Sequence, residues 1–270
     1  MSHIYALANQ KGGVGKTTTA VNLAAYLAAK GKRVLLIDLD AQANATSSLG
    51  FDKSQITVST YNVLINNTPL PEVIQLTRRI RLDLAPSSTQ LAGAEVELVA
   101  LPEREWQLKK AIAAIELNYD YILVDCPPSL GLLTVNALTA AQGVLIPVQC
   151  EYLALEGLSQ LMNTIQLVRK SLNPGLVVRG LIMTMYDGRA KLAQQVVAEV
   201  RSHFGDRVFN TLVPRSIRLG EAPSYGEPIL SYAPSSSGGL AYEQLAEEVL
   251  TGDQIAEVVR QQPPIHANSS

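Results

Sequence analysis

Eight residues near the N-terminus, KGGVGKTT at positions 11–18, constrain the fold of this chain more than any other stretch. An apolar run at residues 4–8 precedes them, and residues 20–27 carry apolar side chains at helical spacing. A strand, a glycine-rich turn and a helix in this order form a cradle for phosphate. Consecutive backbone N–H groups point into one concavity there, and the new helix adds its positive end. The stretch therefore predicts a nucleotide site within an α/β fold.

The P-loop pattern assigns chemistry to individual residues of this stretch. Lys16 is expected to reach the β- and γ-phosphates, and the Thr17 hydroxyl is expected to bind Mg²⁺. The general pattern has glycine at position 10, where this chain has Gln10, and it does not include the second lysine, Lys11. The pattern predicts nucleotide contacts from Gly12, Gly13, Val14, Gly15, Lys16, Thr17 and Thr18, and Lys11 directly precedes them.

Two further predicted strands end in aspartate. Residues 34–37 indicate a buried strand that is followed by Asp38 and Asp40, and residues 121–124 indicate another that is followed by Asp125. Ligands of open α/β sheets bind outside the carboxyl ends of the strands, so these carboxylates are expected beside the phosphate cradle. An aspartate at the end of an apolar strand usually holds Mg²⁺ for a P-loop, directly or through water.

Strand and helix patterns alternate along the rest of the chain. Further strands are predicted at residues 80–85, 143–148, 176–183 and 208–213, and helices at 101–117, 132–141, 155–172, 191–203 and 240–250. Residues 45–79 show no clear period and are expected to form loops and short helices. This alternation predicts a mostly parallel, twisted sheet with helices on both faces. We predict one domain over residues 1–252 and a disordered tail over residues 253–270.

Composition excludes several classes of protein. The formal net charge of the 270 residues is −2, so no global basicity indicates nucleic acid binding. The two cysteines, Cys126 and Cys150, form no C-x-x-C pair, which argues against a disulfide framework or a zinc site. The first residues lack the pattern of a signal peptide, and no apolar run approaches the length of a membrane span. We therefore expect a soluble cytoplasmic protein.

Charge is nevertheless unevenly distributed. Residues 169–218 contain nine Lys or Arg and three Asp or Glu, a net charge of +6, whereas residues 219–270 contain seven acids and one arginine, a net charge of −6. Solvated helix faces would account for such a basic segment, and so would a surface that contacts nucleic acid. Charge alone leaves both interpretations open.

Three motifs in order, KGGVGKTT, LLIDLDAQAN and ILVDCPPSLG, resemble the deviant P-loop ATPases of the ParA and MinD family. Two further stretches, IPVQCEYLALEGLSQL and VPRSIRLGEAPSYGEPI, resemble the ParA/Soj branch of that family. The similarity extends from residue 2 to about residue 251. It implies the deviant P-loop NTPase fold, with ATP and Mg²⁺ as cofactors.

The resemblance also implies a mechanism that needs two subunits. In this family two subunits enclose two ATP molecules, and a signature lysine, here Lys11, crosses to the phosphates of the other subunit. A positive charge that arrives only on dimerisation would neutralise charge developing in phosphoryl transfer. Asp38 and Asp40 are expected to position the attacking water and to sense the γ-phosphate, without a firm division of the two roles.

Further site residues follow from the same resemblance. The adenine pocket is expected near Met185 and Pro214. The residues expected to be linked to Mg²⁺ are Thr17, Asp40 and Asp125. The family binds DNA without sequence preference as ATP dimers, so binding should weaken steeply with salt. The residues expected to contact DNA are Arg189, Lys191, Arg215 and Arg218.

The cargo and several competing functions stay open at this stage. A ParB-type adaptor that stimulates weak hydrolysis would make the chain a segregation ATPase on the nucleoid, whereas another adaptor would let it position a protein cargo such as carboxysomes. A MinD-like membrane ATPase would end in a basic amphipathic helix, but residues 253–262 carry two acids and one arginine. A nitrogenase-reductase-like electron carrier would need cluster-binding thiolates. A dethiobiotin-synthetase-like ligase would not need Lys11.

Overall fold

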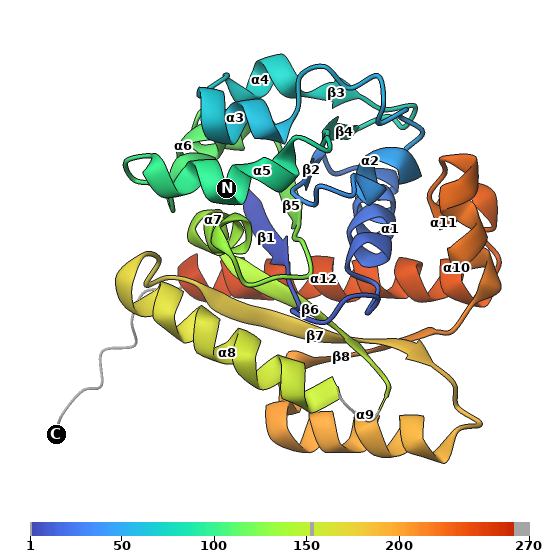
Figure 1. Cartoon of the computed structure of the whole chain (residues 1–270). Coiled ribbons are helices and arrows are strands. Elements are labelled where there is room, and N and C mark those ends of the chain that lie inside the picture. The colour runs from blue at the N-terminus through green and yellow to red at the C-terminus, as the bar shows by residue number, and fades with distance from the viewer. Residues whose placement is uncertain (1, 152–153, 262–270) are drawn as a thin grey trace, which may run out of the picture.

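An eight-stranded sheet forms the centre of the computed structural model, which describes residues 2–151 and 154–261 (Figure 1). The strand order is β3-β4-β2-β5-β1-β6-β7-β8, and every pair is parallel except β3 with β4. The strands are β1 (His3–Leu7), β2 (Val34–Asp38), β3 (Gln75–Leu76), β4 (Leu82–Ala85), β5 (Tyr121–Asp125), β6 (Gly143–Gln149), β7 (Val177–Tyr186) and β8 (Val208–Pro214).

Helices cover both faces of this sheet. They are α1 (Lys16–Ala29), α2 (Asn44–Ser48), α3 (Thr60–Asn66), α4 (Leu70–Val73), α5 (Leu91–Glu97), α6 (Gln107–Ala113), α7 (Leu132–Ala140), α8 (Ala154–Ser171), α9 (Lys191–Phe204), α10 (Ile217–Glu221), α11 (Ile229–Tyr232) and α12 (Ser237–Gln261). Short 3₁₀ turns occur at η1 (Leu98–Ala100), η2 (Glu116–Asn118), η3 (Gly205–Arg207) and η4 (Ala222–Tyr225). The predicted α/β architecture is therefore confirmed.

The pleat of the strands divides the interior into two apolar layers. Ile122 and Val124 of β5 pack into the layer beneath α3 to α9, whereas Tyr121 and Leu123 pack into the layer beneath α1, α11 and α12. Successive strand side chains point to opposite faces, so a strand buried on both faces must be continuously apolar. None of the described helices combines the length and the hydrophobicity that a membrane span requires.

The register of the central strands brings their carboxyl ends together. Leu7, the last residue of β1, lies opposite Asp125 of β5, and Asp38 of β2 lies opposite Asp125 on the other side. The loop that follows β1 therefore starts beside both aspartates. This common edge is where a doubly wound sheet binds its ligand.

The helix predicted at residues 101–117 is shorter in the structure. Pro102 and Glu103 form a turn in which Glu103 has a positive φ of 48°, and α6 begins only at Gln107. Trp106 precedes the helix as its N-cap residue and is partly buried. The apolar residues of the segment recur at helical spacing. The turn around Pro102 nevertheless keeps the first residues of the segment out of the helix.

The C-terminal segment also departs from the prediction of a disordered tail after residue 252. Helix α12 continues to Gln261, and Asp253 is 3% exposed. The Asp253 carboxylate accepts hydrogen bonds from the Tyr5 hydroxyl at 2.6 Å, the Tyr121 hydroxyl at 2.9 Å and Nε of Arg179 at 2.8 Å. These partners stand on three strands of the sheet, so local composition gave no sign of them. Residues 262–270 of the predicted tail lie outside the described residues.

Candidate nucleotide site

The glycine-rich stretch forms the loop between β1 and α1. Gly13 and Gly15 have φ angles of 74° and 87°, in the left-handed region that glycine adopts without steric cost. Thr184 of β7 donates a hydrogen bond from its hydroxyl to the Val14 carbonyl at 2.8 Å and fixes the loop to the sheet. The N-terminus of the 14-residue helix α1 opens directly onto this loop. Backbone N–H groups and a helix N-terminus together favour an anion here.

Lys16 is folded back over the loop. Its side chain is buried, with 6% of the residue exposed, and Nζ donates a hydrogen bond to the Lys11 carbonyl at 3.1 Å. Burial lowers the pKa of Lys16, and the nearby carboxylate of Asp125 opposes this shift. A buried ammonium whose hydrogen-bond partner among the described residues is one neutral carbonyl is well suited to bind an added phosphate.

Asp38 is fully buried at the end of β2, and its carboxylate accepts three hydrogen bonds. Its Oδ2 atom accepts hydrogen bonds from the Thr46 N–H at 2.9 Å and the Thr46 hydroxyl at 2.7 Å, and its Oδ1 atom accepts one from the Asp40 N–H at 3.1 Å. Burial raises the pKa of Asp38 to about 6, and these hydrogen bonds limit the rise. No sequence motif had pointed to Thr46, which lies eight residues after Asp38.

Asp40 is more open to solvent than Asp38. Its Oδ1 atom accepts a hydrogen bond from the Gln42 N–H at 2.9 Å, and its carbonyl accepts one from the Ala43 N–H at 2.8 Å. These contacts close a turn in which Ala43 has a positive φ of 52° and α2 begins at Asn44. Asp40 is thus attached to a local turn, whereas Asp38 is attached to the packed interior.

Asp125 is fully buried, and within the described residues neither carboxylate oxygen has a hydrogen-bond partner of normal length. Burial and the neighbouring Asp38 raise its pKa well above the usual range, while the Thr17 hydroxyl and the Lys16 ammonium act in the opposite direction. An unpaired buried carboxylate is costly. A divalent cation between Asp125 and the Thr17 hydroxyl would remove that cost, so these two residues fit Mg²⁺.

The donor set also has the composition that Mg²⁺ uses in nucleotide enzymes. Within residues 2–151 and 154–261, no group of three or more His, Cys, Asp or Glu side chains forms a closed metal cage. Mg²⁺ usually keeps several waters and binds through one or two carboxylates plus substrate phosphates. A site that is complete only when phosphate is present fits that preference.

A pocket of about 270 Å³ continues from the phosphate loop along the ends of β7 and β8. Met185 and Pro214, the residues predicted for adenine, both line it, together with Gly15 and Thr18 at the loop side. Met185 has a positive φ of 52°, an uncommon conformation for a non-glycine residue. Sequence reasoning missed Tyr242, which also lines this pocket and hydrogen-bonds Thr19 at 3.0 Å.

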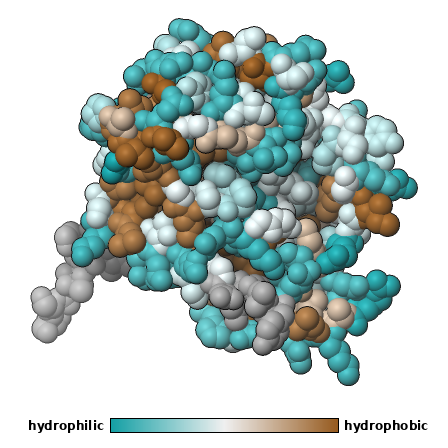
Figure 2. All heavy atoms as spheres, viewed as in Figure 1, coloured by the Kyte–Doolittle hydropathy of each residue, from teal (hydrophilic) through white to brown (hydrophobic). Residues whose placement is uncertain are grey.

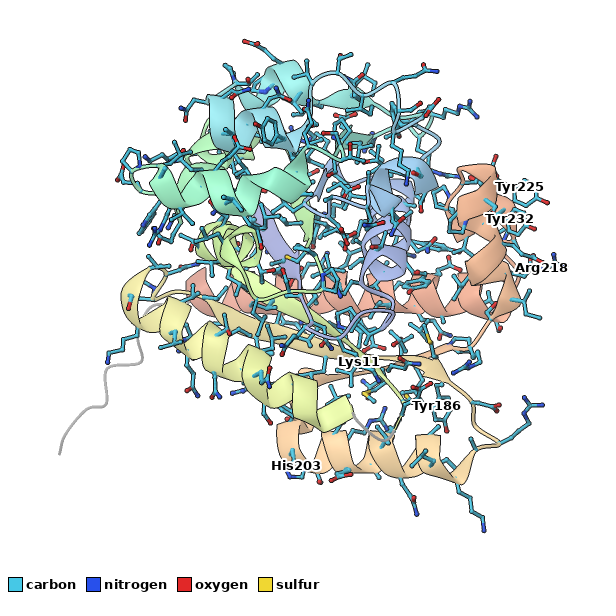
Figure 3. All side chains as sticks on the ribbon, viewed as in Figure 1. Lys11, Tyr186, His203, Arg218, Tyr225 and Tyr232 are labelled. Carbon is cyan, nitrogen blue, oxygen red and sulfur yellow. The ribbon has the colours of Figure 1, made fainter. Side chains whose placement is uncertain are left out.

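Lys11 lies in the loop between β1 and α1 (Figure 3), and its ammonium group forms an ion pair with a neighbouring carboxylate. Its Nζ atom lies 3.8 Å from Oε2 of Glu151. Glu151 also accepts hydrogen bonds from Gln149 at 2.6 Å and from Arg215 at 3.2 Å. The Lys11 backbone N–H donates to Asn9 at 3.1 Å. The sequence gave no reason to single out Glu151, which connects Lys11 to a residue predicted to contact DNA.

The four residues predicted to contact DNA come from two neighbouring connections. Arg189 and Lys191 follow β7, Arg215 and Arg218 follow β8, and the Arg215 N–H donates to the Tyr186 carbonyl at 3.0 Å. The side chains of Arg189, Arg215 and Arg218 are 92%, 63% and 58% exposed. Each of these arginines is also paired with an acid. Arg189 lies 2.9 Å from Asp187, Arg218 lies 2.8 Å from Glu221, and Arg215 contacts Glu151 as described above.

The +6 segment as a whole is not one surface. Arg179 of β7 points inward to Asp253, and Arg201 and Arg207 lie at the end of α9 and in η3, before β8 begins. The four residues predicted to contact DNA therefore form a separate group, on the connections that follow β7 and β8. Charge counting along the sequence could not separate these groups, because it ignores where each strand begins and ends.

The cysteines take no part in this geometry. Cys126 and Cys150 are unpaired and buried, with 1% and 5% of each residue exposed. Burial raises the pKa of Cys126 far above its usual range and that of Cys150 to about 12. Thiols that stay protonated at neutral pH are poor nucleophiles, so neither cysteine is suited to covalent catalysis.

Comparison with known proteins gives consistent similarities. A family profile described as an AAA domain matches residues 2–178. The chain is 55% identical over 249 residues to the sporulation initiation inhibitor protein Soj of Bacillus subtilis (strain 168), a match that covers 92% of this chain and 98% of that protein. It is 51% identical over 253 residues to the chromosome partitioning protein ParA of Myxococcus xanthus (strain DK1622), covering 94% and 89%.

A solved structure is similar over nearly the same length. Cobyrinic acid a,c-diamide synthase from Mycobacterium smegmatis, with bound ADP and magnesium, superimposes with a TM-score of 0.84 at 37% identity. The match covers 95% of this chain and 97% of that one.

Proposed function

This chain belongs to the ParA/Soj family of partition ATPases, and we propose that it is an ATP-dependent switch that dimerises, binds DNA and positions a cargo. The observation that carries the proposal is the meeting of Lys16, Asp38 and Asp125 at one edge of the sheet. A structural neighbour was solved with ADP and magnesium, which supports ATP and Mg²⁺ as the substrate and the metal.

Lys16 would neutralise the β- and γ-phosphates from within its own subunit. Thr17 and Asp125 would hold Mg²⁺, with Asp40 close to the same centre, and the metal would supply charge neutralisation and orientation of the phosphates. Asp38 would hold a water or accept its proton on a carboxylate oxygen, and its pKa of about 6, close to physiological pH, supports this role. Asp40, on its own turn, would follow the presence of the γ-phosphate.

Lys11 would complete the site in a second subunit. Its side chain is half-buried and forms an ion pair with Glu151. This pair keeps the ammonium at the surface of its own subunit. On dimerisation the ammonium would exchange Glu151 for the partner's phosphates, where charge develops during hydrolysis. Turnover would then depend on assembly, which is the property a positioning switch needs.

Non-specific DNA binding would use Arg189, Lys191, Arg215 and Arg218. All four stand on the connections after β7 and β8, and a dimer would double their number. Each arginine that has an acidic partner in the single chain would exchange it for a DNA phosphate. Binding through phosphates alone carries no sequence information and is strongly salt-dependent.

A protein adaptor of the ParB type would stimulate hydrolysis and link the switch to its cargo, a chromosome or plasmid origin. Figure 2 shows apolar side chains gathered on one face over α5, α6 and α7. Val96 of α5 and Val99 of the following turn η1 are 76% and 57% exposed. The carboxylate of Glu95 on α5 lies close to Gly131, in the segment that follows Asp125. A partner bound on this face would act on turnover through Glu95 and the segment that follows Asp125. A protein cargo read by a different adaptor is compatible with the same surface.

A small-molecule amide synthase is the competing enzyme class, because the structural neighbour at 37% identity is named for one. The relatives named for partition are more similar, at 55% and 51% identity. The exposed arginines and Lys11 have an evident use in DNA binding and assembly, and none that is evident in amide synthesis. We therefore favour the partition switch.

DNA binding measured with ATP, ADP or no nucleotide, at two salt concentrations, tests this function. We expect binding only with ATP and Mg²⁺, and a steep loss of affinity at the higher salt concentration. The Lys16→Ala variant should lose nucleotide binding and DNA binding together. DNA binding that ignores the nucleotide, or ATP-dependent amidation of a small acid without any DNA binding, would overturn the proposal.

A further inference from the structure

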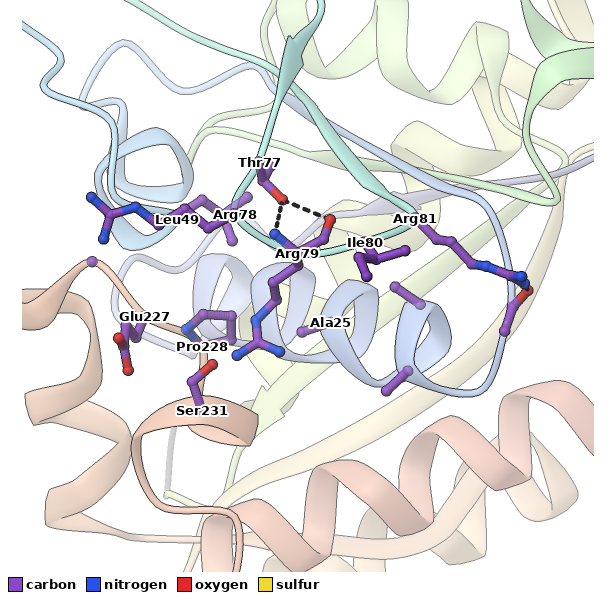
Figure 4. Close-up of a pocket in the computed structure, with 14 residues that line it drawn as sticks. Ala25, Leu49, Thr77, Arg78, Arg79, Ile80, Arg81, Glu227, Pro228 and Ser231 are labelled. Carbon is purple, nitrogen blue, oxygen red and sulfur yellow. Dashed lines mark hydrogen bonds between the residues drawn. The ribbon is translucent and has the colours of Figure 1, made fainter.

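A second pocket, of about 620 Å³, lies at the opposite end of α1 from the phosphate loop (Figure 4). Its floor is the last turns of α1, where Ala25, Ala28 and Ala29 face the cavity. The turn at residues 77–81 forms one wall, and residues 226–228 with Ser231 form the other. Nothing in the proposed ATPase cycle uses this pocket.

Arg79 points into the pocket, between α1 and the segment that holds Pro228 and Ser231 (Figure 4). Arg78 and Arg81 point to either side, and Arg81 donates a hydrogen bond to the Gly31 carbonyl. Across the described part of the chain, Nε of Arg79 is buried without a hydrogen-bond partner, and no acid lies within ion-pair distance of this guanidinium. A buried N–H group without a hydrogen-bond partner carries a desolvation cost, which an anion bound to this guanidinium would relieve.

The backbone holds Arg79 in this position through a closed turn. The Thr77 hydroxyl accepts the Arg79 N–H at 3.0 Å and donates to the Leu82 carbonyl at 2.6 Å. The Leu82 N–H donates to the Arg79 carbonyl at 3.2 Å, and Arg81 has a positive φ of 68°. A non-glycine residue in the left-handed region is uncommon. The turn is therefore well defined, and Arg79 is presented by it rather than by a loose loop.

Of the three arginines that line the pocket, Arg78, Arg79 and Arg81, only Arg79 points into it, beside an apolar wall. The volume of the pocket lies in the range of sites that take small molecules, and the exposed Ala29 and Ile80 supply apolar contact. Glu227 also lines the cavity and acts on Arg79 electrostatically from beyond ion-pair distance. A carboxylate there would repel a polyanion such as a nucleoside triphosphate, and it favours a ligand with a single anionic group.

We propose that this pocket binds a small organic anion, with its single carboxylate or phosphate group on Arg79 and its apolar part on Ala29 and Ile80. The planar guanidinium offers paired donors that match either oxyanion. The Ser231 hydroxyl lies on the same lining and would contact the polar end of the ligand. The site is separate from the phosphate loop, so the inference does not depend on the proposed function.

The test uses the full chain saturated with Mg-ADP, so that the phosphate loop is filled before any probe is added. The probes are phenyl phosphate, benzoate and the neutral control benzyl alcohol, measured by saturation-transfer NMR and titration calorimetry. We expect at least one of the two anions to bind and benzyl alcohol to bind much more weakly. Stronger binding of phenyl phosphate or of benzoate would identify the anionic group.

Two variants locate the site, and a third is the control. Arg79→Gln should weaken anion binding by roughly tenfold to a hundredfold, because it removes a charged hydrogen-bond donor. Ala29→Leu should also weaken anion binding, because the larger side chain fills part of the pocket. Ala29 is an exposed helix position, so this variant should fold normally even if Arg79→Gln does not. Arg104→Gln, at a surface arginine paired with Glu105, should change nothing. Absence of binding by both anions, equal binding of benzyl alcohol, or binding unaffected by the two pocket variants would each overturn the proposal.

Discussion

The Nζ atom of Lys11 lies 3.8 Å from Oε2 of Glu151, whose other oxygen accepts a hydrogen bond from Arg215. The lysine expected to act in a second subunit is thus paired within its own, and the same carboxylate contacts an arginine expected to bind DNA. Assembly and DNA binding would both draw cations away from Glu151. This shared partner gives the two events a physical connection.

Glu151→Gln should therefore favour the ATP-bound dimer. The Lys11 and Glu151 side chains are 35% and 45% exposed, and partly exposed pairs contribute about 0.2 to 1 kcal/mol. We expect dimerisation to tighten by up to about fivefold, measured by sedimentation velocity with a slowly hydrolysed ATP analogue. Glu105→Gln, which removes the partner of Arg104 elsewhere on the surface, is the matched control. Weaker dimerisation of Glu151→Gln would contradict a restraining role for this carboxylate.

Lys11→Ala should separate ATP binding from hydrolysis. Lys16 contacts Lys11 through the Lys11 backbone carbonyl, which alanine keeps, so nucleotide affinity should stay within a few-fold of the parent chain. Loss of a charge that acts only in the transition state should slow hydrolysis by roughly 100-fold or more. Fluorescent-nucleotide binding and phosphate release measure the two effects. Full turnover by Lys11→Ala would rule out the two-subunit mechanism.

Asp38 makes activity depend on pH. Burial raises its pKa to about 6, so the carboxylate needed to hold or deprotonate water forms only as the pH rises through that value. We expect hydrolysis to increase between about pH 5 and pH 7 and then to level off. Asp38→Asn should abolish this rise together with turnover. A flat profile over the same range would overturn the assignment of the water to Asp38.

The same group makes stability depend on pH in the opposite sense. A raised carboxyl pKa means that the folded chain binds a proton between about pH 4 and pH 6 that the unfolded chain has released. Asp38 therefore contributes stability at low pH and loses it as the pH rises through about 6. In the absence of nucleotide and Mg²⁺, Asp38→Asn should unfold at a higher temperature than the parent at pH 8, and the difference should shrink towards pH 5. Asp52→Asn is the control, because Asp52 is exposed and its pKa is lowered by Ser54.

Sequence motifs were sufficient to predict the local structure where the chemical groups and the backbone that positions them lie in the same short segment. KGGVGKTT predicted its own loop because the glycines, the flanking strand and the helix are contiguous, and Asp38 and Asp125 were expected beside it because parallel strands share an edge. Thr46, Glu151 and Arg79 were not anticipated. Their roles depend on which segments the fold brings together, and no periodicity or spacing records that.

Arg218→Glu should remove most ATP-dependent DNA binding and leave ATP binding intact. The side chain is 58% exposed beside Glu221, in α10 and outside the phosphate loop. The dependence of log affinity on log salt should also become shallower, by about one for each DNA phosphate that the variant no longer neutralises. Arg104→Glu makes the same charge change on a surface arginine outside the predicted DNA-binding connections. Unchanged DNA affinity in Arg218→Glu would move the DNA-binding surface elsewhere.

Asp253 holds helix α12 on the sheet, and Asp253→Ala should destabilise the fold. The substitution would leave the partly buried Arg179 guanidinium and the hydroxyls of Tyr5 and Tyr121 without their shared acceptor. Removing one member of a buried ion pair costs about 3 to 5 kcal/mol, which should appear as a lower midpoint in urea unfolding. Glu247→Ala on the same helix loses only an exposed pair with Lys30 and should cost about 1 kcal/mol or less. Equal effects of the two substitutions would show that α12 is held by its apolar face alone.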